Sequence, residues 1–360
     1  MTTELGRLIA HRIALTGPIS IADFMTEALG HPRLGYYRRA MPLGAEGDFT
    51  TAPEISQMFG ELLGAWLADR WLTMGSPASV RLVELGPGRG TLMADALRAT
   101  RGVPGFHAAL DLHLVETSGP LRTAQQTALA AFAPTWHEHF DEVPAGPLLL
   151  VANEFFDALP VRQFHRTAEG WRERMVGLAP DGTLRLALAP GLTPFASALA
   201  DAAPGAEAEF SEAGRALAAA IGARLHQDGG WALIIDYGYD SSTPGSSLQA
   251  VRGHRGADIL ARPGETDLSA HVDFAALAAA SGRPTFGPVA QGDFLRRLGI
   301  LERAHALKRQ ASPEQGRALD AALARLIAPD QMGTLFRVLA MGDDRSAQPA
   351  GFSDTPSDAT

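Results

Sequence analysis

The sequence predicts an α/β fold built on a parallel, doubly wound sheet. From residue 80 onwards, short apolar segments typical of strands alternate with amphipathic segments typical of helices. This alternation is characteristic of parallel sheets whose strands are joined by crossover helices. A glycine-rich turn at 86–90 follows the first of these strands, and such a turn lets the backbone approach a ligand closely. The 360 residues allow one large domain with insertions or two modest ones.

The segment before residue 80 predicts helices. Two apolar-periodic stretches at 3–15 and 20–29 are separated by a Gly-Pro pair at 17–18, so we expect two short helices there. The sequence Thr-Ala-Pro-Glu at 51–54 has the form of a capping box and predicts the start of a third helix. Apolar residues spaced by three and four define its buried face: Ile55, Met58, Phe59, Leu62, Leu63, Trp66 and Leu67.

The strands of the sheet follow in order along the chain. We expect strands at 80–85, 112–116, 136–139, 148–153 and 232–236, with a last one at 334–341. Crossover helices are expected at 90–99 and 120–131. The segment 136–139 carries the poorest strand pattern of the set.

Some eighty residues separate the strands at 148–153 and 232–236, which is too many for one crossover. They predict strands at 161–164, 171–176 and 184–188 and a helix at 211–226. The region 240–330 predicts a loop rich in Ser and Gly and two or three helices. We therefore expect a helical cap region (1–75), a core (76–160 and 227–341), an inserted lid or substrate subdomain (161–226) and a disordered tail (342–360).

The composition argues against several classes of protein. A formal charge of −9 disfavours nucleic-acid binding, which depends on neutralising phosphates with Lys and Arg. No run approaches the roughly 18 apolar residues of a membrane span. Charged side chains among the first twelve residues argue against a signal peptide, so we expect a cytoplasmic protein without a membrane anchor.

Metal and thiol chemistry is also disfavoured. The sequence contains no cysteine, which excludes disulfides, thiolate zinc sites and cysteine nucleophiles. His137 and His139 flank Glu138 at strand spacing, but the eleven histidines are scattered. We expect no metal site.

The glycine-rich turn predicts a nucleotide-like ligand, and the residue before it narrows the choice. Gly86, Gly88 and Gly90 alternate with other residues just after Glu84 at the strand end. A carboxylate there would oppose the pyrophosphate of a dinucleotide, which prefers the positive end of a helix. S-adenosylmethionine has no phosphate, and an acid can favour its ammonium and sulfonium groups. The motif therefore favours this cofactor over NAD.

Glu116 ends the second strand, where an acid can accept hydrogen bonds from both ribose hydroxyls of an adenosyl group. NAD-binding proteins also place an acid at this position, so Glu116 alone does not separate the two ligands. The alternative is a solvated glutamate at a strand end.

The fourth strand ends in Asn153 and Glu154, with Asp157 about one turn further along and two phenylalanines between the acids. Ligands lie off the carboxyl ends of parallel strands, so these residues are expected beside the transferred methyl group. Carboxylates next to aromatic rings suit a guanidinium, which donates planar bidentate hydrogen bonds and stacks on rings. The alternative is that Asn153 and Asp157 cap a turn while the phenylalanines fill the core.

Two loops supply further candidates. The loop containing Gly47, Asp48 and Phe49 could fold over the cofactor and offer a carboxylate to its ammonium group. The segment 263–274 contains Asp267, His271 and Asp273. A His–Asp general base is conceivable there, but a capped helix start beside a loop histidine is the preferred interpretation.

Several blocks of the sequence resemble the MidA family of S-adenosylmethionine-dependent protein arginine methyltransferases, which includes the mitochondrial complex I assembly factor. The most specific blocks are 47–54, 83–91, 153–160 and 263–274, and the similarity extends from 17–19 and 35–37 to 332–336. Thr51-Ala52 replaces a Thr-Ser or Ser-Ser pair common in that family.

The resemblance implies a class I methyltransferase fold, whose last strand is antiparallel, and methyl transfer to an arginine. It implies a subunit of respiratory complex I, or of the bacterial NADH–quinone oxidoreductase, as the first candidate substrate, and a mitochondrial matrix location for eukaryotic relatives. A homodimer is compatible with it. Glu154, with Asp157 and Asn153, is the candidate catalytic group. Three alternatives remain: methylation of a small molecule, a non-catalytic assembly chaperone and, least supported, an NAD oxidoreductase.

Overall fold

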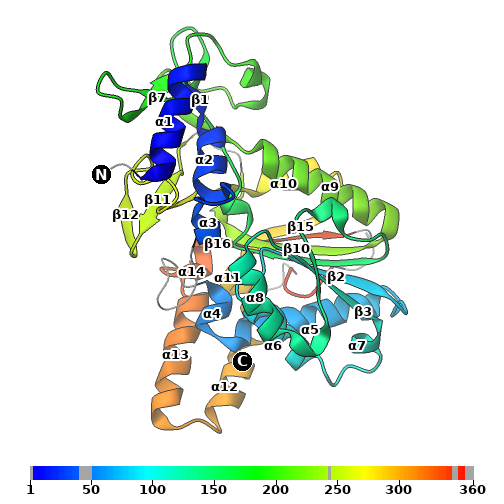
Figure 1. Ribbon diagram of the computed structural model, residues 1–360. Coiled ribbons are helices and arrows are strands. Elements are labelled where there is room, and N and C mark those ends of the chain that lie inside the picture. The colour runs from blue at the N-terminus through cyan, green and yellow to red at the C-terminus, as the bar shows by residue number, and fades with distance from the viewer. Residues whose placement is uncertain (1–2, 40–50, 242–244, 343–347, 353–360) are drawn as a thin grey trace. The chain divides into compact units, whose positions relative to one another are not determined.

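The computed structural model describes residues 3–39, 51–241, 245–342 and 348–352, which form two compact units. The first unit comprises Met1–Phe49, Phe156–Leu217 and Ser241–Val272, and the second comprises Thr50–Phe155, Ala218–Asp240 and Asp273–Thr360. Figure 1 shows the elements of both units. No helix of the described residues is long and apolar enough to cross a membrane.

The second unit contains the predicted α/β sheet. Its strands lie in the order β15-β16-β10-β5-β2-β3-β4. The bounds are β2 Val80–Leu85, β3 Leu110–Val115, β4 Thr135–His137, β5 Leu148–Asn153, β10 Gly230–Tyr239, β15 Thr285–Ala290 and β16 Phe336–Gly342. Strands β4, β3, β2, β5 and β10 run parallel to one another, whereas β16 runs antiparallel to β10 and to β15. The predicted parallel sheet with an antiparallel last strand is confirmed.

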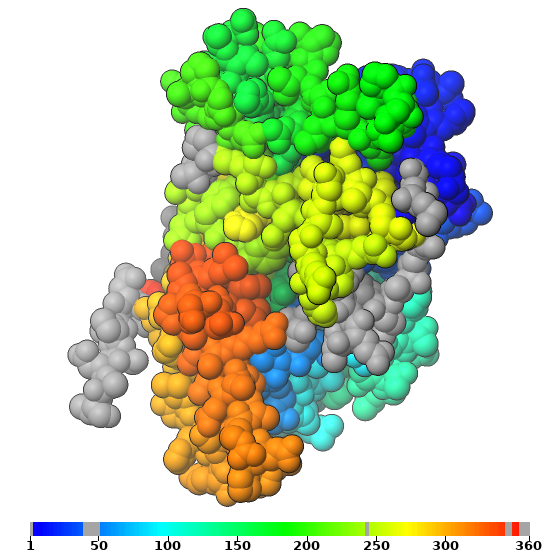
Figure 2. Space-filling view, turned by 90° about the vertical axis from the view of Figure 1, so that its left-hand side faces the viewer, coloured from blue at the N-terminus to red at the C-terminus, as the bar shows by residue number. Residues whose placement is uncertain are grey.

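Helices cover both faces of this sheet. Helices α5 and α6 lie against one face and α10 against the other (Figure 1). The bounds are α4 Ala52–Ile55, α5 Gln57–Thr73, α6 Thr91–Ala99, α7 Phe106–Ala109, α8 Gly119–Ala128, α9 Glu212–Asp228, α10 Phe274–Ser281, α11 Gln291–Arg297, α12 Ile300–Lys308, α13 Pro313–Ile327 and α14 Met332–Leu335. Figure 2 shows α13, in orange, on the surface, and an ion pair between Lys308 and Asp320 ties α12 to it.

The predicted helix after residue 51 differs from expectation at its start. Ser56 has extended backbone, with φ −161° and ψ 136°, and divides the segment into the short α4 and the long α5. The side chain of Thr51 makes no capping hydrogen bond, so the predicted capping box is wrong. The Ser56 side chain caps α5 by accepting from the Met58 N–H. The predicted apolar face is confirmed in the core, which contains Met58, Phe59, Leu62, Leu63, Trp66 and Leu67.

The first unit combines helices with two small sheets. Its helices are α1 Glu4–Thr16, α2 Ile21–Gly30 and α3 Tyr36–Arg39. One sheet has the order β1-β7-β6-β9 with β8 on the other side of β7, and its strands are β1 Ile19–Ser20, β6 Arg162–Arg166, β7 Trp171–Leu178, β8 Leu184–Leu188 and β9 Glu207–Phe210. The other has the order β12-β11-β13, with β11 Gln249–Arg252, β12 Arg255–Ala257 and β13 Asp267–Ser269.

The hairpin predicted in the insertion is confirmed as β6 and β7, which pair antiparallel with Gln163 opposite Arg174. The region 240–330 was expected to contain a loop and two or three helices, and this expectation is incomplete. It also holds the strands β11 to β15, including the two-residue β14 (Val272–Asp273), and four helices, α10 to α13. Strand β15 contains a Gly-Pro pair and a register shift between Phe286 and Val289, which removes the regular alternation of a strand.

Candidate active site

Three of the predicted residues lie at the carboxyl ends of adjacent strands in the second unit. In the register of the sheet, Glu84 of β2 lies opposite Leu114 of β3 and Val151 of β5. Glu116 directly follows β3, and Asn153 is the last residue of β5. The sheet therefore brings the ends of these strands together at one edge, where ligands bind in open α/β sheets.

Glu84 is almost completely enclosed. It is 3% exposed, and its Oε2 atom has no hydrogen-bond partner among the described residues. Burial raises the pKa of this carboxyl from 4.5 to about 8 because the charged form loses its hydration. A cationic group placed beside it would satisfy the oxygen and favour the ionised form.

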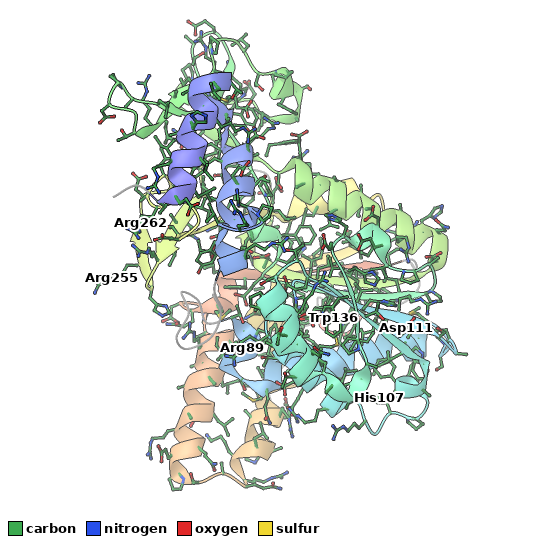
Figure 3. The ribbon with its side chains drawn as sticks, viewed as in Figure 1. Arg89, His107, Asp111, Trp136, Arg255 and Arg262 are labelled. Atoms are coloured by element: carbon green, nitrogen blue, oxygen red, sulfur yellow. The ribbon has the colours of Figure 1, made fainter. Side chains whose placement is uncertain are left out.

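The glycine-rich turn has a backbone that other residues adopt with difficulty. Gly86, Gly88 and Gly90 have φ values of 61°, 54° and 85°. A Cβ atom on Gly86 would also lie 2.6 Å from the Phe155 ring. Gly90 then serves as the N-cap of α6, and Arg89 of the same turn is labelled in Figure 3.

The Glu116 carboxylate is held on both of its oxygens. Oε1 accepts from the Ser118 N–H at 2.7 Å, and Oε2 accepts from the Gln125 amide at 3.3 Å. Burial raises the pKa of this group, and the hydrogen bond from Ser118 is the largest opposing effect. The carboxylate therefore has a fixed orientation, with lone pairs left for a ligand.

Ser118 is a site candidate that the sequence analysis missed. Its side chain is fully buried, and in the described part of the chain its Oγ atom has no hydrogen-bond partner. It is the N-cap of α8, yet its hydroxyl makes no capping bond. Its position two residues after Glu116 could have identified it as a candidate from the sequence.

Asn153 and Glu154 form a connected pair at the end of β5. Glu154 Oε1 accepts from the Asn153 side-chain amide at 3.1 Å and from the Ala52 N–H at 2.8 Å. Glu154 also has a left-handed backbone, with φ 51°. Such strain in a non-glycine residue persists only where the surroundings impose it, and it is common at functional sites. Within the described residues, Asn153 Oδ1 is buried without a partner.

The candidates Asp157 and Asp267 belong to the first unit and not to the second. The Asp157 carbonyl oxygen accepts from the Ala270 N–H. In the same unit, the Tyr37 hydroxyl donates to Asp267 Oδ1 at 3.1 Å. Burial raises the pKa of Tyr37 well above its usual value, and the Asp267 and Asp157 carboxylates raise it further. Tyr37 was not singled out by the sequence analysis.

The other residues of the 263–274 segment have structural partners. The His271 N–H donates to Ser247 Oγ. Asp273 caps α10 by accepting from the Ala276 N–H, as the preferred interpretation of this segment predicted. The predicted residues Gly47, Asp48 and Phe49 lie outside the described part of the chain.

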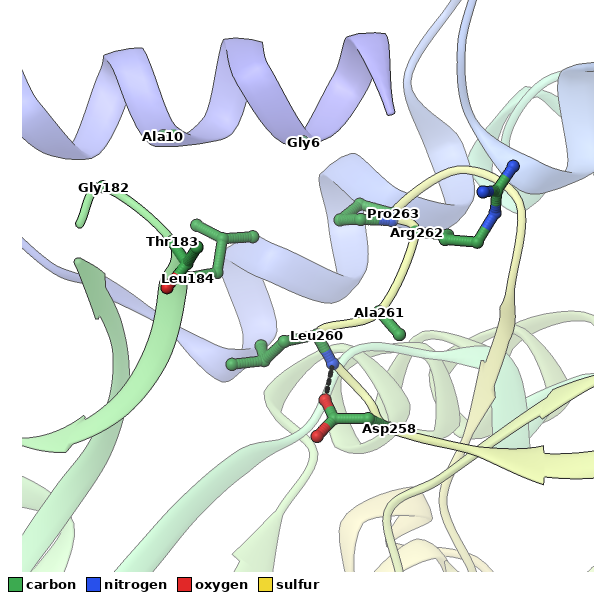
Figure 4. Close-up of a pocket in the computed structure, with 10 residues that line it drawn as sticks. All are labelled: Gly6, Ala10, Gly182, Thr183, Leu184, Asp258, Leu260, Ala261, Arg262 and Pro263. Carbon is green, nitrogen blue, oxygen red and sulfur yellow. Dashed lines mark hydrogen bonds between the residues drawn. The ribbon is translucent and has the colours of Figure 1, made fainter. Parts of the chain in front are cut away.

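A cavity of about 360 Å³ lies within the first unit (Figure 4). Its wall is mainly small or apolar, and consists of Gly6, Ala10, Gly182, Thr183, Leu184, Asp258, Leu260, Ala261, Arg262 and Pro263. The Asp258 carboxylate accepts from the Leu260 N–H at 2.8 Å, as the dashed line shows. The predicted site residues do not line this cavity.

The residues at the strand ends fit S-adenosylmethionine. Glu84, Ser118 and Asn153 each present a buried oxygen without a partner in the described structure, and they lie close to the carboxyl ends of β2, β3 and β5. These oxygens can accept hydrogen bonds from an ammonium group or from hydroxyls. The described residues contain no group of three or more His, Cys, Asp or Glu side chains arranged to hold a metal ion. The individual assignments of residues to cofactor or acceptor remain predictions.

Comparison with known proteins agrees with this chemistry. A family model described as "Putative S-adenosyl-L-methionine-dependent methyltransferase" matches residues 62–288. The mitochondrial protein arginine methyltransferase NDUFAF7 of Danio rerio is 38% identical over 359 residues, covering 91% of this chain and 84% of the relative. The human protein of the same name is 35% identical over 371 residues, covering 94% and 83%.

A solved structure extends the similarity to the fold and the ligand. A superfamily member from Burkholderia thailandensis, crystallised with S-adenosyl-homocysteine, has a TM-score of 0.84 and 29% sequence identity. The match covers 97% of this chain and 94% of that one. The family resemblance predicted from the sequence motifs is thereby confirmed, and the chain belongs to the family of S-adenosyl-L-methionine-dependent methyltransferases.

Proposed function

We propose that the chain transfers a methyl group from S-adenosylmethionine to an arginine of a protein substrate. The observation that carries the proposal is Glu154, whose carboxylate is held by the Ala52 N–H and the Asn153 amide at the end of β5. A carboxylate fixed in this way can orient a planar guanidinium. The names of the curated relatives support arginine as the acceptor.

The cofactor supplies an electrophilic methyl group on a sulfonium. The residues of this chain bind the cofactor and orient it and the acceptor. Glu84 would balance the charge of the cofactor's ammonium group, and Glu116 would accept hydrogen bonds from the ribose hydroxyls. A guanidinium, with a pKa above about 12, is a poor nucleophile. Glu154, together with Asn153, would draw the positive charge of the guanidinium onto the nitrogens that do not react, so catalysis comes mainly from positioning and electrostatics. The contribution of Asp157 stays a prediction.

The identity of the protein substrate is the finer part of the proposal. The family resemblance makes a subunit of respiratory complex I, or of its bacterial equivalent, the first candidate. A cytoplasmic location and a homodimer are consistent with this role and remain predictions. The negative charge of the chain suits a basic substrate segment.

Exchanging Glu154 for Gln tests the proposal. The amide keeps the shape but loses the charge that pairs with a guanidinium, so we expect methyl transfer to fall by at least about a hundredfold while affinity for S-adenosyl-homocysteine stays within about threefold. The wild type and variant are incubated with labelled S-adenosylmethionine and lysate of a deletion strain, and the labelled protein and residue are identified by mass spectrometry.

Glu302→Gln, an exposed position on α12, is the matched control and should retain full activity. Unchanged labelling by Glu154→Gln would refute the role of Glu154. Label found only in small molecules would indicate a different acceptor. Rescue of the deletion strain by an inactive Glu154→Gln protein would instead indicate an assembly chaperone.

A further inference from the structure

Gln125 of α8 is a fully buried polar side chain that contacts two parts of the cofactor site. Its Nε2 atom donates to the Gly88 carbonyl at 2.8 Å and to Glu116 Oε2 at 3.3 Å. Its Oε1 atom accepts from the Trp136 indole N–H at 2.8 Å. The glycine-rich turn, the acid after β3 and strand β4 are therefore joined through one amide.

Trp136 determines which way this amide faces. An indole N–H can only donate a hydrogen bond, so it must meet the amide oxygen. The two N–H groups of Gln125 are then directed at Gly88 and Glu116, both of which are acceptors. A flipped amide would leave the Trp136 N–H, the Gly88 carbonyl and the Glu116 carboxylate without suitable partners, which is costly because these groups are buried or partly buried. Trp136 is labelled in Figure 3.

The Glu116 carboxylate therefore accepts a hydrogen bond on each of its oxygens. The Ser118 N–H holds Oε1, and Gln125 holds Oε2. The hydrogen bond from Gln125 to Oε2 also sets the distance between this carboxylate and the backbone of the glycine turn, because the same nitrogen donates to the Gly88 carbonyl.

We propose that Gln125 is a positioning residue for the cofactor, and that it holds Gly88 and Glu116 in the one arrangement that accepts the adenosyl group. Trp136 supports it by fixing the orientation of its amide. The inference rests on the proposed use of Glu116 and the glycine turn for cofactor binding. It assigns Gln125 a role in affinity for the cofactor, and none in the methyl-transfer step.

The first experiment measures the affinity of the full chain for S-adenosyl-homocysteine by titration calorimetry. Gln125→Met fills a similar volume but removes all three hydrogen bonds, so we expect binding to weaken about tenfold or more. Gln126→Met, at the exposed next position of α8, is the matched control and should bind like the wild type. Trp136→Phe removes only the group that orients the amide, and a smaller loss is expected.

If Gln125 only stabilised the fold, its contribution to cofactor affinity would not depend on the residue at position 116. We expect Gln125→Met to weaken binding strongly in the wild type but by less than about threefold in a Glu116→Gln background, because the positioned carboxylate is already lost. In steady-state assays the same variant should raise the KM for S-adenosylmethionine while kcat at saturation stays within about threefold. Thermal unfolding of each variant verifies that it is folded.

Two results would overturn the inference: a folded Gln125→Met protein with wild-type affinity, or an equal loss with and without Glu116. If the wild-type chain itself fails to bind S-adenosyl-homocysteine, the proposed function fails as well. Wild-type binding together with an insensitive Gln125→Met variant would refute only the positioning role.

Discussion

At the residue scale, the site is defined by buried oxygens that the protein leaves without partners. Buried polar atoms are normally hydrogen-bonded, so each exception requires an explanation. Glu84 Oε2, Ser118 Oγ and Asn153 Oδ1 are exceptions within the described residues, and they lie close to the carboxyl ends of three neighbouring strands. A bound cofactor with an ammonium group and hydroxyls would supply the missing donors.

Glu84 should make the cofactor-free protein less stable as pH rises. Its carboxyl has a pKa of about 8 when folded and 4.5 as the ordinary value. Between these values the folded chain keeps a proton that the unfolded chain has lost, so the free energy of unfolding decreases with increasing pH. The full difference is at most about 5 kcal/mol. Glu84→Gln cannot ionise and should lack this decrease.

Urea unfolding of both proteins at pH 5 and pH 8.5, without cofactor, measures the effect. We expect Glu84→Gln to gain stability relative to the wild type at the higher pH. Glu302→Gln, which alters an exposed carboxylate, provides the control for a general effect of charge. The same stability difference at both pH values would show that Glu84 is not protonated in the folded state.

At the scale of elements, the site depends on how closely α5 and α6 approach each other. Thr91 begins α6 and donates to Glu54 of α4, while Gly60 and Gly64 allow α5 to lie directly against α6. A Cβ atom on Gly64 would lie 2.6 Å from the Ala96 carbonyl oxygen. Because α6 starts at the glycine turn, its position also sets that of the turn.

Gly64→Ala should therefore destabilise the protein although alanine favours helices. Overpacking costs typically about 1–3 kcal/mol, and the intrinsic gain of alanine over glycine is only about 1 kcal/mol. Gly316→Ala in α13 is the matched control, since a Cβ atom there meets nothing within 4 Å, and it should stabilise by about 0.5–1 kcal/mol. Urea unfolding measures both, and a stabilised Gly64→Ala protein would contradict the close contact.

The elements also show what the sequence could and could not predict. Strands β2 and β5 were predicted with their observed bounds because both are rich in Val and Leu and lie between clear turn signals. The start of α5 was misplaced because the Thr-Ala-Pro-Glu motif is a good capping pattern, yet the extended backbone of Ser56 interrupts the helix. Strand β15 was missed because its Gly-Pro pair is a turn signal in any local reading.

At the scale of the whole molecule, the order of the strands locates the site. From β2 the chain proceeds to β3 and β4 on one side, and then crosses to β5 and β10 on the other. The direction in which successive strands are added to the sheet reverses between β2 and β5, and ligands of such sheets bind at this switch point. Glu84 lies one residue before the end of β2 and Asn153 ends β5, and these two strands flank the switch point. The division of the chain into cap, core, inserted subdomain and tail stays a prediction.

The site residues that could not be predicted from the sequence depend on contacts between residues far apart along the chain. The acids Glu84, Glu116 and Glu154 could be identified because each stands next to a strand end. The hydrogen bonds of Gln125 to Gly88, 37 positions earlier, and of Tyr37 to Asp267, 230 positions later, have no local signature. Burial of the Ser118 hydroxyl likewise follows from packing, which no pattern of neighbouring residues encodes.

The net charge of the chain, −9, leads to a prediction about the substrate. A negative field speeds the approach of a basic segment, and salt screens it over about 10 Å at 0.1 M. The KM for a basic arginine-containing peptide should therefore rise severalfold between about 50 and 300 mM salt, whereas the KM for an acidic peptide with the same arginine should stay constant or fall. Steady-state kinetics with both peptides at saturating cofactor separates this from a general effect of salt on the enzyme. Equal behaviour of the two peptides would show that recognition does not use the charge of the molecule.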